Sequence, residues 1–216
     1  MVKDLSKTCA DSLRTLSQEK YGIKLKASHA HELVAAYFGY NSQNAMLADR
    51  KYPISNLHQA EIIILMPDEF IDQRRAKLQE LPKELPDRNT LGKRIASSLF
   101  SDNSWQSIYP VFDSFEEAAE YIAEFYHPHI KTLFTKGNHP YKLFVDKKIT
   151  EDIIHLTVYY AYASENSPEE MECNRIITID LPRLAGHIGY GKPKVFLQTL
   201  TSEFKQSLKS LRVNYE

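Results

Sequence analysis

The chain has 216 residues, of which 43% are apolar and 25% are charged, and its formal net charge is −1. This length allows one large domain or two small ones with a buried core, and the balance of apolar and charged residues excludes an intrinsically disordered chain. A net charge so close to zero also excludes an overall electrostatic attraction to nucleic acid or to an anionic membrane.

The cysteines and the N-terminal residues bear on the cellular compartment. Cys9 and Cys173 lie far apart and form no CxxC motif or Cys/His cluster, so they indicate neither a disulfide framework nor a cysteine-based zinc site. The N-terminal sequence MVKDLSKTCADSLRTL lacks the apolar core of a signal peptide, and no segment approaches the length of a membrane span. We therefore expect a cytoplasmic protein with no membrane partner.

Apolar residues at helical spacing predict three helices near the N-terminus. The first is expected over residues 3–20, with Gly22 ending it. Ser28 is a suitable N-cap for a second helix, and Gly39 stands where a C-terminal glycine belongs. Ser42 is then expected to cap a third, shorter helix.

The next segment suggests a domain boundary. The apolar run 61–66 predicts a buried strand, and the charged residues 68–79 follow a helical pattern. Two prolines with charges between them make residues 82–87 the best linker candidate. The sequence therefore predicts a mostly helical domain over 1–81 and an α+β domain over 88–216.

The second half of the chain mixes helices and strands. Helices are expected near residues 90–100, after a capping box at Ser114–Glu117, and after Pro193. Strands are expected at 141–146, 153–163 and 173–181, with a turn at 166–170 between the last two strands. Because strands and helices do not alternate regularly, the fold class is expected to be α+β. It would have a helical N-terminal part with a short strand, followed by an antiparallel sheet flanked by helices.

Residues 28–49 have the arrangement of a helix-turn-helix. Ala35 is a small residue where two helices would touch, and Gly39 follows where the chain would reverse. A DNA-binding unit of this kind presents its second helix to the major groove. The candidate nucleic-acid or partner-binding residues are Asn41, Ser42, Gln43, Asn44, Arg50 and Lys51. Amide side chains pair with adenine edges and cations with phosphates, but a compact helix hairpin needs the same small residue and glycine for packing or protein contact.

The run SHAHELVAAYFGYNSQNAMLAD also resembles a known family. It is similar to a short helical domain near the N-terminus of bacterial proteins from plasmids and integrated elements, sometimes given a glyoxalase-related name. The resemblance covers residues 3–80 at most, and no family is recognised for residues 88–216. It implies a mobile-element context and a recognition module. It does not imply glyoxalase chemistry, because the metal ligands of paired βαβββ modules are not found here.

Eight histidines raise the question of a metal site. His29 and Glu32 share a helix face, whereas His29 and His31 point apart. A zinc site needs three or four converging ligands, and the sequence contains only pairs and no HExxH motif. Histidines at helix ends commonly serve capping, so we expect neither a metal nor another cofactor.

A glycine-rich segment forms the second candidate site. Its candidate anion-binding residues are Arg183, Gly186, His187, Gly189, Gly191 and Lys192. Glycine amides, a lysine and the N-terminus of a following helix together suit an anion. The segment is neither GxGxxG nor a Walker loop, and a tight reversal of the chain needs glycine for geometry alone.

Two functional readings follow. The preferred hypothesis is a non-enzymatic bacterial binding or accessory protein. Its N-terminal helix pair would recognise DNA or a protein partner, and its C-terminal part would supply a homo-oligomer contact or a second binding contact. The alternative is an enzyme acting on a phosphate-bearing or other anionic substrate at residues 183–192, with His187 as acid or base and Arg183 stabilising charge.

Overall fold

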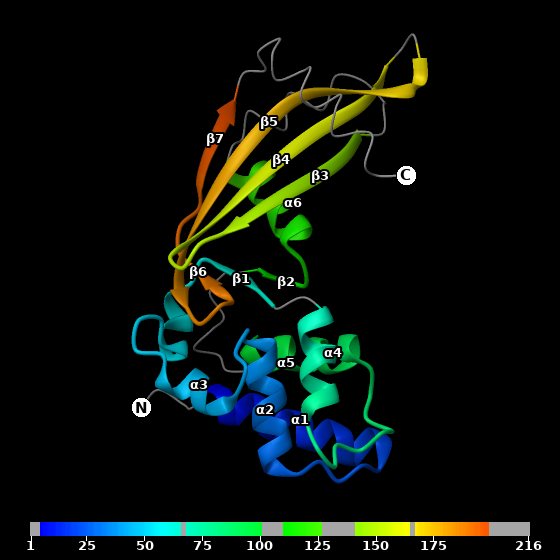
Figure 1. The fold of residues 1–216 in the computed structure, drawn as a ribbon, viewed down its shortest axis with the longest axis vertical. Helices are drawn as coiled ribbons and strands as arrows, with labels where there is room; N and C mark the ends of the chain where they lie inside the picture. The colour runs from blue at the N-terminus through cyan, green and yellow to red at the C-terminus, as the bar shows by residue number, and fades with distance from the viewer. Residues whose placement is uncertain (1–4, 66–67, 101–109, 127–140, 165–166, 199–216) are drawn as a thin grey trace. The chain divides into compact units, whose positions relative to one another are not determined.

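The computed structural model describes residues 5–65, 68–100, 110–126, 141–164 and 167–198 (Figure 1). Its contacts divide the chain into two compact units. Unit 1 comprises residues 1–114 together with 183–192, and unit 2 comprises 115–182 together with 193–216. The mixture of N-terminal helices and a largely antiparallel sheet confirms the α+β class.

Unit 1 is mainly helical. Its helices are α1 (Leu5–Tyr21), α2 (Ala27–Tyr37), α3 (Gln43–Ala48), the 3₁₀ helix η1 (Ile54–Gln59), α4 (Asp68–Lys77) and α5 (Arg88–Phe100). The three expected N-terminal helices are present. Gly39 follows α2 with a φ of +83°, and the Ser42 hydroxyl accepts a hydrogen bond from the Ala45 amide at 3.0 Å. Ser28 is not the N-cap of α2, because Lys26 is the last extended residue and the helix begins at Ala27.

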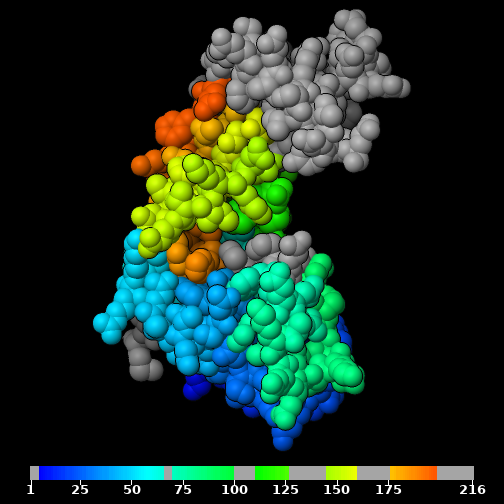
Figure 2. Space-filling model, viewed as in Figure 1, coloured from blue at the N-terminus to red at the C-terminus, as the bar shows by residue number. Residues whose placement is uncertain are grey.

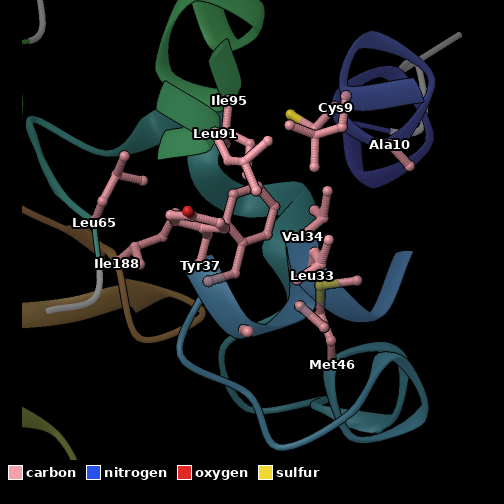
Figure 3. Close-up of a cluster of buried hydrophobic side chains, with 14 of the residues drawn as sticks. Cys9, Ala10, Leu33, Val34, Tyr37, Met46, Leu65, Leu91, Ile95 and Ile188 are labelled. Carbon is pink, nitrogen blue, oxygen red and sulfur yellow. The ribbon is translucent and has the colours of Figure 1, made fainter. Parts of the chain in front are cut away.

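Helices α1, α2 and α5 pack together around the core of unit 1. Figure 3 shows side chains from all three helices in one apolar cluster, which Met46 and Ile188 join from other parts of the chain. Leu85 is 6% exposed and belongs to the same core, and Arg75 donates to the Pro86 carbonyl at 2.9 Å. Residues 82–87 therefore pack within unit 1, and the compact units divide after Ser114 rather than at the expected linker.

A small sheet completes unit 1. The buried strand β1 (Ile62–Ile64) pairs in parallel with β2 (Val111–Phe112) and antiparallel with β6 (Gly189–Tyr190). The expected strand near residues 61–66 is thus confirmed. Because β6 comes from the glycine-rich segment, that segment is part of the N-terminal unit although it lies far along the chain.

Unit 2 is an antiparallel sheet with one helix. Its elements are α6 (Phe115–Tyr126), β3 (Tyr141–Ile149), β4 (Ile153–Ser164), β5 (Ser167–Ala185, whose last three residues belong to unit 1) and β7 (Lys194–Gln198). The strand order is β3-β4-β5-β7, and α6 packs against β3 and β7. The strand expected at 153–163 is confirmed, and in it the side chains of 154, 156 and 158 are buried while those of 155 and 157 are partly exposed.

Two elements of unit 2 differ from expectation. Residues 167–170 are the start of β5 rather than a turn, because Ser164 and Ser167 are paired across the sheet. Residues 194–198 form β7 rather than the start of a helix, because they pair with residues 176–180 of β5. The rest of that expected helix lies outside the described residues. None of the described helices has the length and apolar composition needed to cross a membrane.

Candidate functional site

The two candidate segments from the sequence lie against each other in unit 1. The Gly186 amide donates to the Tyr52 carbonyl at 2.8 Å, and the His187 amide donates to the Phe38 carbonyl at 3.4 Å. Side chains join the segments as well, since Arg183 Nη2 lies 3.2 Å from Asp49 Oδ2. The glycine-rich segment is therefore packed on the chain that surrounds α3.

Asp49 is the centre of this contact. Its carboxylate accepts hydrogen bonds from the Tyr40 hydroxyl at 2.7 Å and from the amides of Lys51 at 3.1 Å and Tyr52 at 2.9 Å, in addition to Arg183. Burial by itself would raise the pKa of the Asp49 carboxyl. The hydrogen bonds from Tyr40 and Tyr52 and the charge of Arg183 outweigh burial and hold that pKa below its ordinary value.

Arg183 has two further contacts besides Asp49. Its Nε donates to the Gly186 carbonyl, and its guanidinium lies 4.5 Å from the centre of the Tyr52 ring. The Arg183 side chain is 13% exposed and that of Asp49 15%. An anion would therefore have to compete with an existing carboxylate, a carbonyl and an aromatic ring for this guanidinium.

His187 packs edge-on against Tyr40, with 5.0 Å between the ring centres, and its carbonyl accepts from the Tyr190 hydroxyl at 2.5 Å. Burial, assisted by the charge of Arg183, lowers the pKa of His187, although Asp49 opposes the shift. Burial and the hydrogen bond to Asp49 raise the pKa of Tyr40. We call Tyr40, Asp49, Tyr52, Arg183 and His187 the Arg183 cluster; its contacts connect two loops.

Packing explains two of the three glycines in this segment. Gly186 has a φ of +53°, and a Cβ there would lie 3.1 Å from Ile54 and 3.2 Å from Tyr40. A Cβ on Gly189 would lie 2.6 Å from Leu57. The expected helix N-terminus is absent, because β7 begins at Lys194; Gly191 is partly exposed and Lys192 exposed. The geometry thus accounts for Gly186 and Gly189 without a bound anion.

The residues around α3 differ in their exposure. Ser42 is used as a cap and Gln43 is partly buried, whereas Asn41, Asn44, Arg50 and Lys51 are exposed. Leu47, which the sequence did not single out, is 62% exposed on the same short helix. We call Asn41, Asn44, Leu47, Arg50 and Lys51 the α3 surface. In Figure 2 the chain that follows α3 is coloured sky blue and lies on the face in view.

Other reactive groups have ordinary structural surroundings. Arg74 donates to Glu32, so the Glu32 carboxylate has a partner other than a metal. No group of three or more metal-binding side chains occurs among the residues that the structure describes. Cys9 is a fully buried free thiol, and burial raises its pKa to about 12, whereas the side chain of Cys173 lies outside the described residues. A thiol with so high a pKa is a poor nucleophile.

Comparison of the chain with protein-family models, curated proteins and solved structures found no match.

Proposed function

We propose that this chain is a non-enzymatic binding protein that recognises DNA through the α3 surface. The observation that carries the proposal is the Asp49 carboxylate, which binds the amides of Lys51 and Tyr52 and the guanidinium of Arg183. These hydrogen bonds and the ion pair fix the loop after α3. The side chains of Arg50 and Lys51 in this loop are exposed, with the Lys51 ammonium 5.4 Å from the centre of the Tyr52 ring. A braced loop binds a ligand with a smaller loss of conformational entropy than a free loop.

The charge of this surface suits a polyanion. Residues 41–48 contain no acidic side chain, and the acid that follows, Asp49, is paired with Arg183. Arg50 and Lys51 are the two cations that follow this paired carboxylate in the sequence, and both side chains are exposed. Exposed cations contact phosphates, which supply most of the affinity of non-specific DNA binding.

The contribution of α3 to base recognition is small. At 1.5 Å per residue, its six residues make a helix about 9 Å long. Ser42 is engaged as the cap, so Asn41 and Asn44 are the exposed side chains that remain to read adenine edges. We therefore expect weak sequence preference and a binding energy that comes mainly from phosphate contacts.

Fluorescence polarisation of a labelled random DNA duplex at about 20 mM salt tests the proposal, because electrostatic binding is strongest there. The double variant Arg50→Glu/Lys51→Glu should abolish saturable binding. The matched control Lys20→Glu/Lys24→Glu changes the same charge at exposed positions away from α3 and should have a smaller effect. Absence of binding by the unmodified chain, or equal loss in both variants, would show that the α3 surface does not recognise DNA.

A protein contact at the same surface is the second candidate, and the exposed side chain of Leu47 favours it. Protein interfaces combine an apolar centre with a polar rim, and Leu47 lies between amides and cations in this way. Photocrosslinking in cells tests the protein contact, with the photoreactive residue placed at position 47. The control places it at Tyr21 of α1, which is 39% exposed. A protein contact at the α3 surface requires a crosslinked protein adduct from position 47 and none from position 21, and Arg50→Glu/Lys51→Glu should remove that adduct. Equal amounts of adduct from both positions would refute a specific contact.

A further inference from the structure

The two edge strands of the unit 2 sheet differ in composition. β3 forms one edge and carries the charged and exposed residues Asp146, Lys147 and Lys148 in succession. Charged side chains hinder the pairing of an edge strand with another strand. β7 forms the other edge, and its only charged residue is Lys194 at its first position, followed by Val-Phe-Leu-Gln. The β7 edge therefore lacks the protection that the β3 edge has.

The apolar side chains of β7 are open to solvent. Phe196 is 51% exposed and Leu197 43%. Among the strands that the structure describes, β7 has one neighbour, β5, and it is the outermost strand on that side of the sheet (Figure 1). A strand has backbone donors and acceptors on both of its edges. An edge strand with exposed apolar side chains is a template for the addition of another strand.

The sequence of β7 is complementary to itself in antiparallel register. Two copies paired about Phe196 would place this residue opposite its equivalent, Val195 opposite Leu197, and Lys194 opposite Gln198. Such a ladder contains an aromatic pair and aliphatic pairs, which stabilise a sheet, and sets no like charges opposite each other.

The same register would continue the apolar face of the sheet. Val195 and Leu197 lie beside the buried residues Ile179 and Ile177 of β5. Because side chains alternate along a strand, Val195 and Leu197 share the face of these two isoleucines. Leu197, which is exposed in the single chain, would then be covered by Val195 of the second copy.

We propose that β7 is a dimerisation edge, to which β7 of a second copy of this chain adds in antiparallel register centred on Phe196. The contact is two-fold symmetric, so it closes after two chains and forms no filament. A ladder of five residues buries less than the ~1,000 Å² of a stable interface, so the dimer is weak, with a dissociation constant of about 10–100 µM. The inference does not depend on the proposed function, because the α3 surface belongs to unit 1.

Sedimentation velocity of the full chain between about 5 and 500 µM tests the inference and should show a monomer that converts to a dimer. Phe196→Lys and Phe196→Glu each place like charges opposite one another and should weaken the dimer at least about tenfold. An equimolar mixture of the two variants places opposite charges at the same position and should restore the dimer. The matched control is Ile149→Lys, at a residue of β3 that is 60% exposed, and it should change the dissociation constant less than about twofold.

Four results would overturn the inference. The first is a monomer at every concentration of the unmodified chain, which needs no variant to be decisive. The second is a dimer that both Phe196 variants leave intact. The third is a mixture that dimerises no better than either variant alone, because position 196 would then not face its equivalent. The fourth is equal weakening by Ile149→Lys. Circular dichroism of each variant should match that of the unmodified chain, since both substituted side chains are at least half exposed.

Discussion

Arg183 and Asp49 are separated by more than half of the chain and form one nearly buried pair. Each of them also binds the neighbouring backbone, so the pair fixes the loop after α3 and the turn before β6 at once. Burial raises the pKa of the neighbouring Tyr40 and lowers that of His187. At the scale of single residues, the Arg183 cluster therefore holds the loop that carries Arg50 and Lys51 in a fixed position.

Asp49→Asn should destabilise unit 1 by about 3 kcal/mol, because the substitution leaves a nearly buried guanidinium without its counter-charge. The matched control is Asp11→Asn, since Asp11 pairs with Arg14 at the surface, where both side chains are about half exposed. Its cost should stay within about 0.5 kcal/mol. Urea unfolding followed by the helical circular dichroism signal measures both values. Equal costs would mean that the pair contributes no more than a surface pair.

His187 should make stability depend on pH. Its pKa in the folded chain is lower than the ordinary value of 6.5, so the unfolded chain takes up a proton first as the pH falls. Stability is therefore expected to fall as the pH is lowered from 6.5 toward the folded pKa. Unfolding free energies at about pH 7.5 and 5.5 should show a larger loss for the unmodified chain than for His187→Asn. Identical losses would assign the pH dependence to other groups.

At the scale of elements, the glycine-rich segment is a strand connection. The sequence suggested a loop before a helix, but this segment forms β6 between the end of β5 and the start of β7. Gly189 lies against Leu57 of η1, and this close approach leaves no room for a side chain. Glycine is needed here so that β6 can lie against η1 and still pair with β1.

Gly189→Ala should cost about 2–3 kcal/mol, because its Cβ would overlap with Leu57 and Ala185. Gly22→Ala is a suitable comparison, since Gly22 has a φ of +70° but no atom within 4 Å of the added carbon, and should cost about 1 kcal/mol from backbone strain alone. In a Leu57→Ala background the cost of Gly189→Ala should shrink, as measured by a double-mutant cycle in urea. An unchanged cost would contradict a clash with Leu57.

At the scale of the whole molecule, the two compact units are not consecutive pieces of chain. The segment 183–192 returns to unit 1, where the amides of Ile64 and Glu61 donate to the carbonyls of Ile188 at 2.9 Å and Tyr190 at 2.8 Å. Ile188 and Tyr190 are buried there. Unit 1 therefore depends on a segment that the chain supplies only after most of unit 2.

A fragment of residues 1–114 should consequently fail to unfold cooperatively. It lacks residues 183–192, so β1 loses its antiparallel neighbour and the unit loses the buried side chains of Ala185, Ile188 and Tyr190. Joining residues 183–192 to this fragment through a flexible glycine–serine linker should restore a sigmoidal urea transition followed by circular dichroism. If the fragment alone unfolds with the same midpoint as the joined fragment, β6 is dispensable for unit 1.

The amino-acid sequence by itself determined the local elements of this protein. Periodic apolar residues located α1 and α2, a strand was expected where β4 lies, and Gly39 and Ser42 marked the end of one helix and the start of the next. These features depend on spacing and capping within a few residues, so they can be read without the fold.

The tertiary structure alone decided how these elements are grouped and which polar residues are used internally. The pairing of Arg183 with Asp49, the inclusion of Leu85 in the core and the pairing of β7 with β5 each join residues that are distant in sequence. Local pattern carries no information on such contacts. A strand such as β7 forms because a neighbouring edge satisfies its backbone, and a charge such as Asp49 is buried because its partner arrives from elsewhere in the chain.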